Sequence, residues 1–177
     1  KLWQEMKKLM RAEEVESIFD VETELFPCLV DMRFLGVRVD IQEAHSLKQK
    51  LVQEEKECLL QVQKETGIEP QIWAARSIEK VFQKLSLPFD RTEKTGAPSF
   101  TKNFLQNHPH KLVKLIARAR EINKAHTTFI DTIIKYEHKG RIHAEINQLR
   151  SDQGGTVTGR FSYANPNLQQ IPARNKE

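Results

Sequence analysis

Two long stretches of this sequence repeat apolar side chains at helical spacing, and they constrain the fold more than any other feature. The first runs from Asp40 to Gly67, and the second follows Pro109. The repeating residues are Ala44, Leu47, Leu51, Cys58 and Val62 in the first stretch, and Leu112, Leu115, Ile116, Ala119, Ile122, Phe129 and Ile133 in the second. Apolar residues three or four positions apart share one face of an α-helix, so each stretch predicts a long helix that packs along that face.

Local signals predict where the helices of the first half begin and end. Asp40 followed by Glu43 resembles a capping box that opens the first long helix, and Gly67 is suited to end it. An earlier helix is expected to end at Gly36, with Pro27 in its first turn, where the missing N–H of proline costs nothing.

Shorter elements are expected elsewhere. The polar residues 91–98 predict an exposed loop, and Ser99 is a candidate cap for a short helix that ends before the second long stretch. Residues 142–146 alternate apolar and polar side chains, and residues 156–158 are β-branched, so we expect two short strands joined by a loop. The predicted fold class is mainly α with a small antiparallel β element.

Charge is distributed unevenly along the chain. Residues 1–70 carry 10 basic and 15 acidic side chains, whereas residues 71–177 carry 18 basic and 9 acidic ones. Within residues 101–130 the basic side chains, against Glu121 as the acid, are Lys102, Lys111, Lys114, Arg118, Arg120 and Lys124. A basic half indicates a polyanionic partner, although a solvated helix face would show the same composition.

Several other classes of protein are not supported by the sequence. No apolar run approaches the roughly 20 residues of a membrane helix, and no secretory signal is visible. The cysteines, Cys28 and Cys58, lie far apart, which favours free thiols in a reducing compartment and hence a cytoplasmic protein. His108 and His110 form a pair, but no metal-ligand spacing surrounds them, and no phosphate-binding loop or nucleophile elbow is present. We therefore expect no metal site and no catalytic residues in this chain.

Residues 156–172 read TVTGRFSYANPNLQQIP and resemble the TGRxS…PNLQxIP segment of the DNA polymerase I family, also called family A. Four more segments resemble elements of that family in the family's order: LFPCLVDMRFLGVRVD (25–40), RTEKTGAPSF (91–100), REINKAHTTFID (120–131) and GRIHAEINQ (140–148). Residues 147–155 are longer and more polar than the compact bacterial form, and this feature resembles phage-encoded members.

The resemblance implies a domain organisation and a function. Residues 1–139 would form a helical thumb subdomain with its supporting helices, and residues 140–177 would form the first strands of the palm. The family's first catalytic aspartate and its nucleotide-binding fingers helix lie beyond the matched segments, so this fragment alone is expected to be inactive. The parent protein would add deoxynucleotides from deoxynucleoside triphosphates to a primer 3′ end, with Mg²⁺ in a two-metal site, in a bacterial or phage-infected host cytoplasm.

The resemblance also implies which residues of the TGR and PNLQ segments contact DNA. Arg160 would donate to the minor-groove edge of the primer-terminal pair, where acceptors occupy nearly equivalent places in every base pair. Gly159 would let the backbone approach closely. Asn167 and Gln170 would contact the template side. The structural alternatives are an internal ion pair for Arg160 and turn capping for the two amides.

In the thumb, Lys124 and Thr128 match positions that would contact the phosphate backbone. His126 stands where relatives often carry a second lysine, so a contact there would be weaker or pH-dependent. Lys94 and Lys102 are further phosphate candidates, and ordinary solvated charge is the alternative for each lysine.

Two rival functions remain open at this stage. One is a free-standing, non-catalytic nucleic-acid-binding module that uses the basic half of the chain. The other is a helical protein-interaction domain in which the helix predicted between Asp40 and Gly67 docks a partner.

Overall fold

The computed structural model describes residues 1–149 and 154–171. The chain forms two compact units, the helical unit Ile41–Ile134 and a two-segment unit made of Lys1–Asp40 and Lys135–Glu177. The predicted thumb–palm boundary after residue 139 concerns function and stays a prediction. Residues 150–153 of the predicted longer turn, and Pro172 of the PNLQQIP segment, lie outside the described residues.

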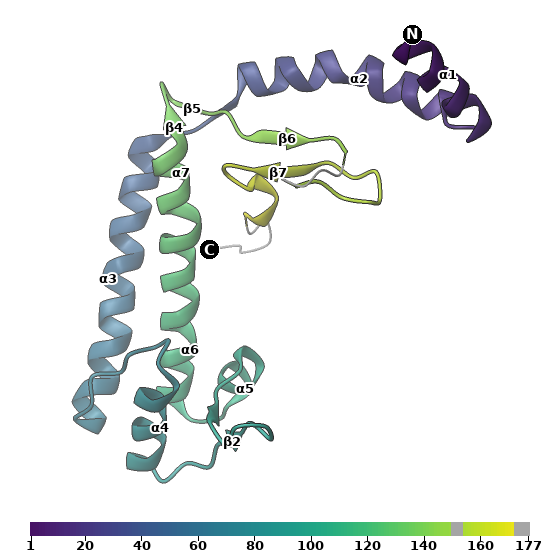
Figure 1. Ribbon diagram of the computed structural model, residues 1–177. Helices are drawn as coiled ribbons and strands as arrows, with labels where there is room; N and C mark the ends of the chain where they lie inside the picture. Colours follow the sequence, from purple (N-terminus) through teal and green to yellow (C-terminus); the bar gives the residue numbers. More distant parts are fainter. Residues whose placement is uncertain (150–153, 172–177) are drawn as a thin grey trace. The chain divides into compact units, whose positions relative to one another are not determined.

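The helical unit is built on a pair of long helices that lie side by side (Figure 1). Its elements are α3 (Ile41–Thr66), α4 (Ala75–Lys84), the antiparallel pair β2 (Asp90–Arg91) and β3 (Pro98–Ser99), α5 (Lys102–Asn107), α6 (Lys111–Lys124) and the π-helix η1 (Ala125–Ile130). Helix α7 (Asp131–Tyr136) continues from η1. The two predicted amphipathic stretches are therefore confirmed as α3 and as α6 with η1.

Apolar side chains of α3, α4, α5 and α6 form the core of this unit. The fully buried members include Val62, Ile78, Val81, Phe82, Leu105, Val113 and Ile116. Phe82 lies in an aromatic cluster, with ring centroids 4.8 Å from Phe100, 5.9 Å from Phe104 and 6.1 Å from Phe89. These contacts close the end of the unit at which α4 and α5 meet α6.

The His108 and His110 pair has a structural role at the start of α6. His108 Nδ1 accepts from the backbone N–H of His110 at 3.1 Å, and His110 Nδ1 accepts from the N–H of Leu112 at 3.3 Å. Burial lowers the pKa of His108, and the neighbouring His110 lowers it further. The pair therefore caps a helix, and in the described residues no group of three or more His, Cys, Asp or Glu side chains is arranged to hold a metal ion.

The predicted helix boundaries are correct where glycine ends a helix and wrong at the cap of α5. Gly67 follows α3 with a φ of +71°, and Gly36 follows α2 (Glu16–Leu35) with a φ of +68°, a backbone region that favours glycine. The cap of α5 is Thr101, whose hydroxyl accepts from Phe104 N at 3.3 Å. Ser99 instead pairs in β3, because the predicted loop folds back as a hairpin.

The π-helix η1 keeps one face of the long helix buried. Ile122, His126 and Ile130 follow one another in steps of four residues, and all three are buried. In an α-helix, four residues turn through about 400°, so each such step rotates the side chain about 40° past the position of the previous one. The wider π turn compensates for this drift, so the apolar stripe remains against α3.

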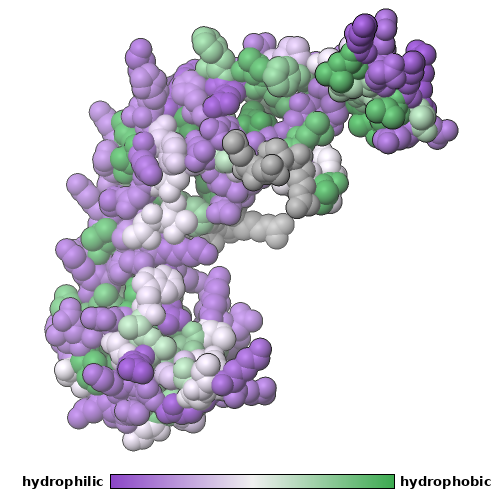
Figure 2. Space-filling view, viewed as in Figure 1, coloured by the Kyte–Doolittle hydropathy of each residue, from purple (hydrophilic) through white to green (hydrophobic). Residues whose placement is uncertain are grey.

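The two-segment unit contains α1 (Leu2–Ala12), α2 (Glu16–Leu35) and short strands. One sheet has the order β1-β5-β4, from Val37–Arg38, Arg141–Ile142 and Glu137–His138, and a second pairs β6 (Glu145–Asn147) with β7 (Ser162–Ala164). Both sheets are antiparallel, as predicted, and a 3₁₀ turn, η2 (Leu168–Gln170), follows β7. Figure 2 shows hydrophobic side chains on the surface of α1 and α2. Phe26 and Phe34 are exposed apolar residues of α2.

Two local predictions for this unit are wrong, and the strand predicted over residues 142–146 is divided between β5 and β6. Pro27 lies inside α2, because that helix begins at Glu16, well before the apolar repeat from which its start was inferred. Residues 156–158 form a turn, because the Thr156 hydroxyl donates to the carbonyl of Arg160 at 2.6 Å and bends the chain. The strand that pairs with β6 is Ser162–Ala164.

The two thiols differ in exposure, which predicts different reactivity. Cys28 is exposed and Cys58 is buried in the core between α3 and α6. Burial raises the pKa of Cys58, and the nearby Glu54 carboxylate raises it further, so less of the reactive thiolate forms at pH 7 to 8.

We expect a thiol reagent to modify Cys28 rapidly, and to modify Cys58 only after the protein is unfolded in urea. Rapid modification of both thiols in the folded chain would contradict this assignment.

None of the helices in the described residues is long and apolar enough to serve as a membrane span.

Candidate nucleic-acid interface

A groove between α5 and α6 brings two of the predicted phosphate-binding lysines together. It measures about 270 Å³ and is lined by Trp73, Lys102, Leu105, Gln106, Ala117, Arg120, Glu121 and Lys124. Leu105 and Ala117 are buried where the two helices meet, whereas Lys102 and Lys124 are exposed. We call this feature the α5–α6 groove.

The basic side chains of residues 101–130 divide into an internal and an external set. Arg118 Nε lies 2.8 Å from Glu54 Oε1. Arg120 donates to the carbonyls of Ile72 and Phe100, both at 2.7 Å, and its pKa is lowered by burial although a guanidinium remains protonated. These two arginines therefore join parts of the unit to one another.

The external set consists of exposed lysines. Lys102 Nζ lies 4.0 Å from Glu121 Oε1, a distance and exposure at which an ion pair contributes little. Within residues 1–149 and 154–171, no ion pair involves Lys111, Lys114 or Lys124. The exposed positive charge of α5 and α6 thus comes from these four lysines, of which Lys102 and Lys124 line the α5–α6 groove.

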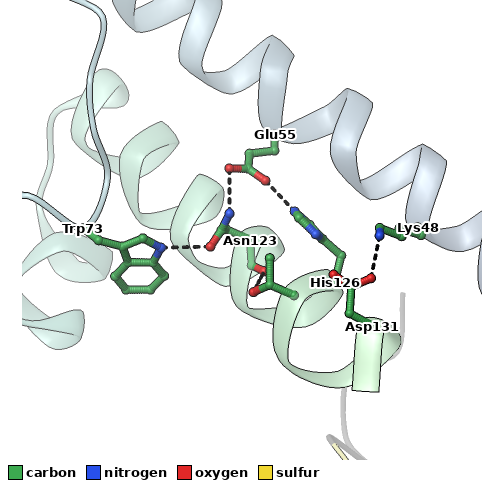
Figure 3. Close-up of polar contacts among 7 residues, drawn as sticks. Lys48, Glu55, Trp73, Asn123, His126 and Asp131 are labelled. Atoms are coloured by element: carbon green, nitrogen blue, oxygen red, sulfur yellow. Dashed lines mark hydrogen bonds and ion pairs between the residues drawn. The ribbon is translucent and has the colours of Figure 1, made fainter. Parts of the chain in front are cut away.

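A polar network centred on Glu55 holds α3 against α6 and η1 (Figure 3). Glu55 Oε1 accepts from Asn123 Nδ2 at 3.0 Å, and Glu55 Oε2 lies 2.6 Å from His126 Nε2. Asn123 Oδ1 in turn accepts from the indole N–H of Trp73 at 2.8 Å. Lys48 of α3 and Asp131, the first residue of α7, form an ion pair of 2.5 Å. The network fixes the rotation of the helix that carries Lys124.

The structure corrects the interpretation of His126. Its side chain is buried and bound to Glu55, so it does not supply the weaker phosphate contact that the sequence suggested. A signal for this was present in the sequence, because His126 lies four residues after Ile122 of the predicted stripe and four residues before Ile130, which the structure shows to be buried.

The other predicted phosphate contacts of the helical unit are exposed. Lys124 and Thr128 are both at the surface, one turn apart at the junction of α6 and η1. Lys94 is exposed in the turn between β2 and β3 and does not line the α5–α6 groove. Of the four predicted phosphate contacts, Lys102 and Lys124 line the same groove, whereas Lys94 and Thr128 do not.

The TGR segment forms a tight turn that presents Arg160 at the surface. The hydrogen bond from Thr156 to the Arg160 carbonyl closes the turn, and Gly159 adopts a φ of +70° within it. A Cβ at Gly159 would meet no atom within 4 Å, so its left-handed backbone is the structural reason for glycine here. In the described part of the chain, the Arg160 guanidinium makes no ion pair or hydrogen bond, and the residue is exposed.

The two predicted amides of the PNLQ segment differ. Asn167 Oδ1 accepts from Gln169 N at 3.1 Å and caps η2, which is the turn-capping alternative considered for it. Gln170 is exposed, and its backbone N–H donates to the carbonyl of Asn167 at 3.3 Å. The Gln169 side chain donates to the Phe161 carbonyl at 3.0 Å and ties η2 to the start of β7.

Comparisons with known proteins identify the family. The family model for DNA polymerase family A matches residues 41–177. The chain is 32% identical over its whole length to DNA polymerase DpoZ of Acinetobacter phage SH-Ab 15497, and 34% identical over 88% of its length to the thermostable DNA polymerase I of Thermus filiformis. It spans 31% and 19% of those two relatives, respectively. The predicted likeness to phage-encoded members is thus confirmed.

A solved structure shows the same fold. The POL domain of Pol1 from M. smegmatis, in complex with DNA primer-template and dNTP, superposes with a TM-score of 0.68 at 23% identity, over 84% of this chain and 26% of that one. The mainly helical fold with small antiparallel sheets is therefore confirmed. Because the family model extends over most of the residues in which the ordered motifs occur, this chain belongs to DNA polymerase family A.

Proposed function

We propose that this chain is the part of a template-directed DNA polymerase that grips the primer-template duplex. The parent protein would extend a primer 3′ end with deoxynucleoside triphosphates. The observation that carries the proposal is the exposed Arg160 at the end of the TGR turn, in a chain of family A. The names of the phage and bacterial relatives, and the DNA in the solved neighbour, support it.

The exposed lysines would supply affinity without sequence preference. Lys102 and Lys124 line one groove, and Lys94 and Thr128 lie at other exposed positions of the same unit. Ammonium and hydroxyl groups that donate to phosphate oxygens position a protein on DNA without reading its bases. A few such contacts would hold the duplex weakly and in a salt-dependent way.

Arg160 would test the shape of the newly formed base pair. Minor-groove acceptors occupy similar places in all four base pairs, so a donor there senses pair geometry rather than sequence. Gly159 would allow close approach of the backbone, and Gln170 with the Nδ2 group of Asn167 would donate on the template side. The exposure of these residues is compatible with such contacts.

Nucleotidyl transfer would need a divalent metal such as Mg²⁺ in the parent enzyme. Because the described residues contain no cluster suited to a metal ion, we assign no metal ligand to this chain. The parent would act in the cytoplasm of a bacterium or of a phage-infected host.

A salt titration of duplex binding tests the proposal. The logarithm of the binding constant should fall linearly with the logarithm of salt concentration, with a slope of about −0.9 for each phosphate neutralised. Replacing Lys102 and Lys124 together by alanine should make the slope shallower by about 1.8, as measured by anisotropy of a labelled primer-template.

The matched control is Lys111→Ala, which removes an exposed lysine of α6 that does not line the α5–α6 groove. This variant should retain the original slope. An unchanged slope in the double variant would contradict the role of the groove lysines. Absence of any binding at low ionic strength would instead support a helical interaction domain.

A further inference from the structure

Trp73 is an exposed aromatic side chain that is nevertheless held in place. Its side chain remains 60% exposed, yet its indole N–H donates to Asn123 Oδ1 at 2.8 Å. The guanidinium carbon of Arg120 lies 5.4 Å from the ring centroid, and Arg120 is itself held by two backbone carbonyls. The orientation of the ring is thus fixed, although much of its surface is open to solvent.

Trp73 lies beside two surface hollows, one of which is lined by basic side chains. The ring lines the α5–α6 groove with Lys102 and Lys124, and it also lines a second, more open hollow with Gln71 and Ala74. Glu121 is the acidic residue among the groove residues, and its carboxylate accepts a hydrogen bond from Gln106 and lies 4.0 Å from Lys102. A volume of about 270 Å³ lies just below the roughly 300 to 1,000 Å³ of drug-sized sites, so the groove suits a group of about one nucleotide.

A flat aromatic face beside positive charge is the chemistry that recognises single-stranded nucleic acid. Unpaired bases stack on aromatic side chains while cations follow the phosphates, and the interaction tolerates any base. Bases within a duplex are covered by their neighbours and offer no free face to such a ring. Because the Arg120 cation lies over the ring and Asn123 holds its N–H edge, the ring is already ordered. Stacking a base on it therefore costs less conformational entropy.

We propose that Trp73, with Lys102 and Lys124, forms a binding site for an unpaired nucleotide of single-stranded DNA. The ring would stack on the base and the two lysines would contact its phosphates. This inference rests on the proposed function to the extent that the lysines also serve duplex DNA, but stacking on Trp73 is specific to unpaired DNA.

The test measures affinities of the full chain for labelled oligothymidylate and for a blunt duplex of equal charge, at low salt, by fluorescence anisotropy. Trp73→Leu should bind the single strand about tenfold more weakly, a loss of about 1.4 kcal/mol, and the duplex with less than a twofold change. Trp73→Phe, which keeps a ring, should retain most of the single-strand affinity and guards against a general loss of structure. In a Trp3→Phe chain, binding of the single strand should quench the fluorescence of Trp73.

Trp3 provides a matched control. It is 46% exposed and has Lys7 Nζ 5.2 Å from its ring centroid, but it belongs to α1. Trp3→Leu should leave single-strand binding unchanged.

Equal single-strand affinity of the unmodified chain and Trp73→Leu would overturn the inference, as would equal losses for single strand and duplex in a folded variant. If the unmodified chain binds the single strand with quenching but does not bind the duplex, the inference holds and the proposed duplex grip fails. If the unmodified chain binds the duplex, but the single strand does not quench the fluorescence of Trp73, the proposed duplex grip holds and the inference fails.

Discussion

Glu55→Ala should lower the free energy of unfolding of the helical unit by about 3 kcal/mol. The change removes the acceptors of the partly buried Asn123 Nδ2 and the buried His126 Nε2, and a buried donor left unpaired costs about 1 to 3 kcal/mol. The loss should be measured by urea unfolding followed through the fluorescence of Trp73 in a Trp3→Phe background, because Trp73 is bonded to Asn123 of the same network.

The adjacent residue supplies the control. Glu54 pairs with Arg118 at 2.8 Å, but the two side chains are 41% and 40% exposed. An exposed pair of this kind contributes about 0 to 1 kcal/mol. Glu54→Ala removes the same charge from the same helix and should therefore cost much less than Glu55→Ala. Equal costs would show that the Glu55 network does not hold the two helices together.

The second large effect is expected on primer extension by the full-length protein, if it is the polymerase proposed above. Arg160→Ala should slow primer extension by about tenfold to a hundredfold, and most strongly from mismatched primer ends. A hydrogen bond from a charged group contributes about 1.5 to 3 kcal/mol, and each 1.36 kcal/mol corresponds to a factor of ten in rate. Folding should change little, because Arg160 is exposed. Single-turnover extension from matched and mismatched primers measures the effect.

Two comparisons sharpen this experiment. Arg38→Ala removes another exposed arginine of the two-segment unit and should extend primers at the normal rate. Arg160→Lys keeps the charge but loses the planar fork of donors, so it should recover only part of the rate. Normal extension by Arg160→Ala would remove the proposed minor-groove role.

Sequence reasoning predicted those features that depend on neighbouring residues. The repeat of apolar side chains located α3 and α6, and Gly36 and Gly67 marked helix ends because their left-handed backbone is a local requirement. The family motifs identified the chain because they are short, ordered segments. The exposure of Arg160 also follows locally, from a turn closed within five residues.

The features that sequence reasoning missed depend on how distant elements meet. Glu55 and His126 are 71 residues apart, and their contact depends on the register of α3 against the α6–η1 helix. Trp73 lies in no repeat, and its bond to Asn123 spans 50 residues. The β-branched residues 156–158 have strand propensity, but a side-chain hydrogen bond to the backbone competed with the strand and prevailed.

The π-helix η1 has a consequence for how the chain tolerates changes in length. A deletion of one residue between Lys124 and Asp131 could be absorbed by a return to the ordinary α repeat, without opening a gap in the helix. Lys124 would then keep its orientation relative to the residues that follow, whereas the same deletion inside the regular α6 helix would rotate the residues on either side by about 100°. The π turn is thus the place in this long helix where one residue can be lost while Lys124 stays at the surface and Ile130 stays in the core.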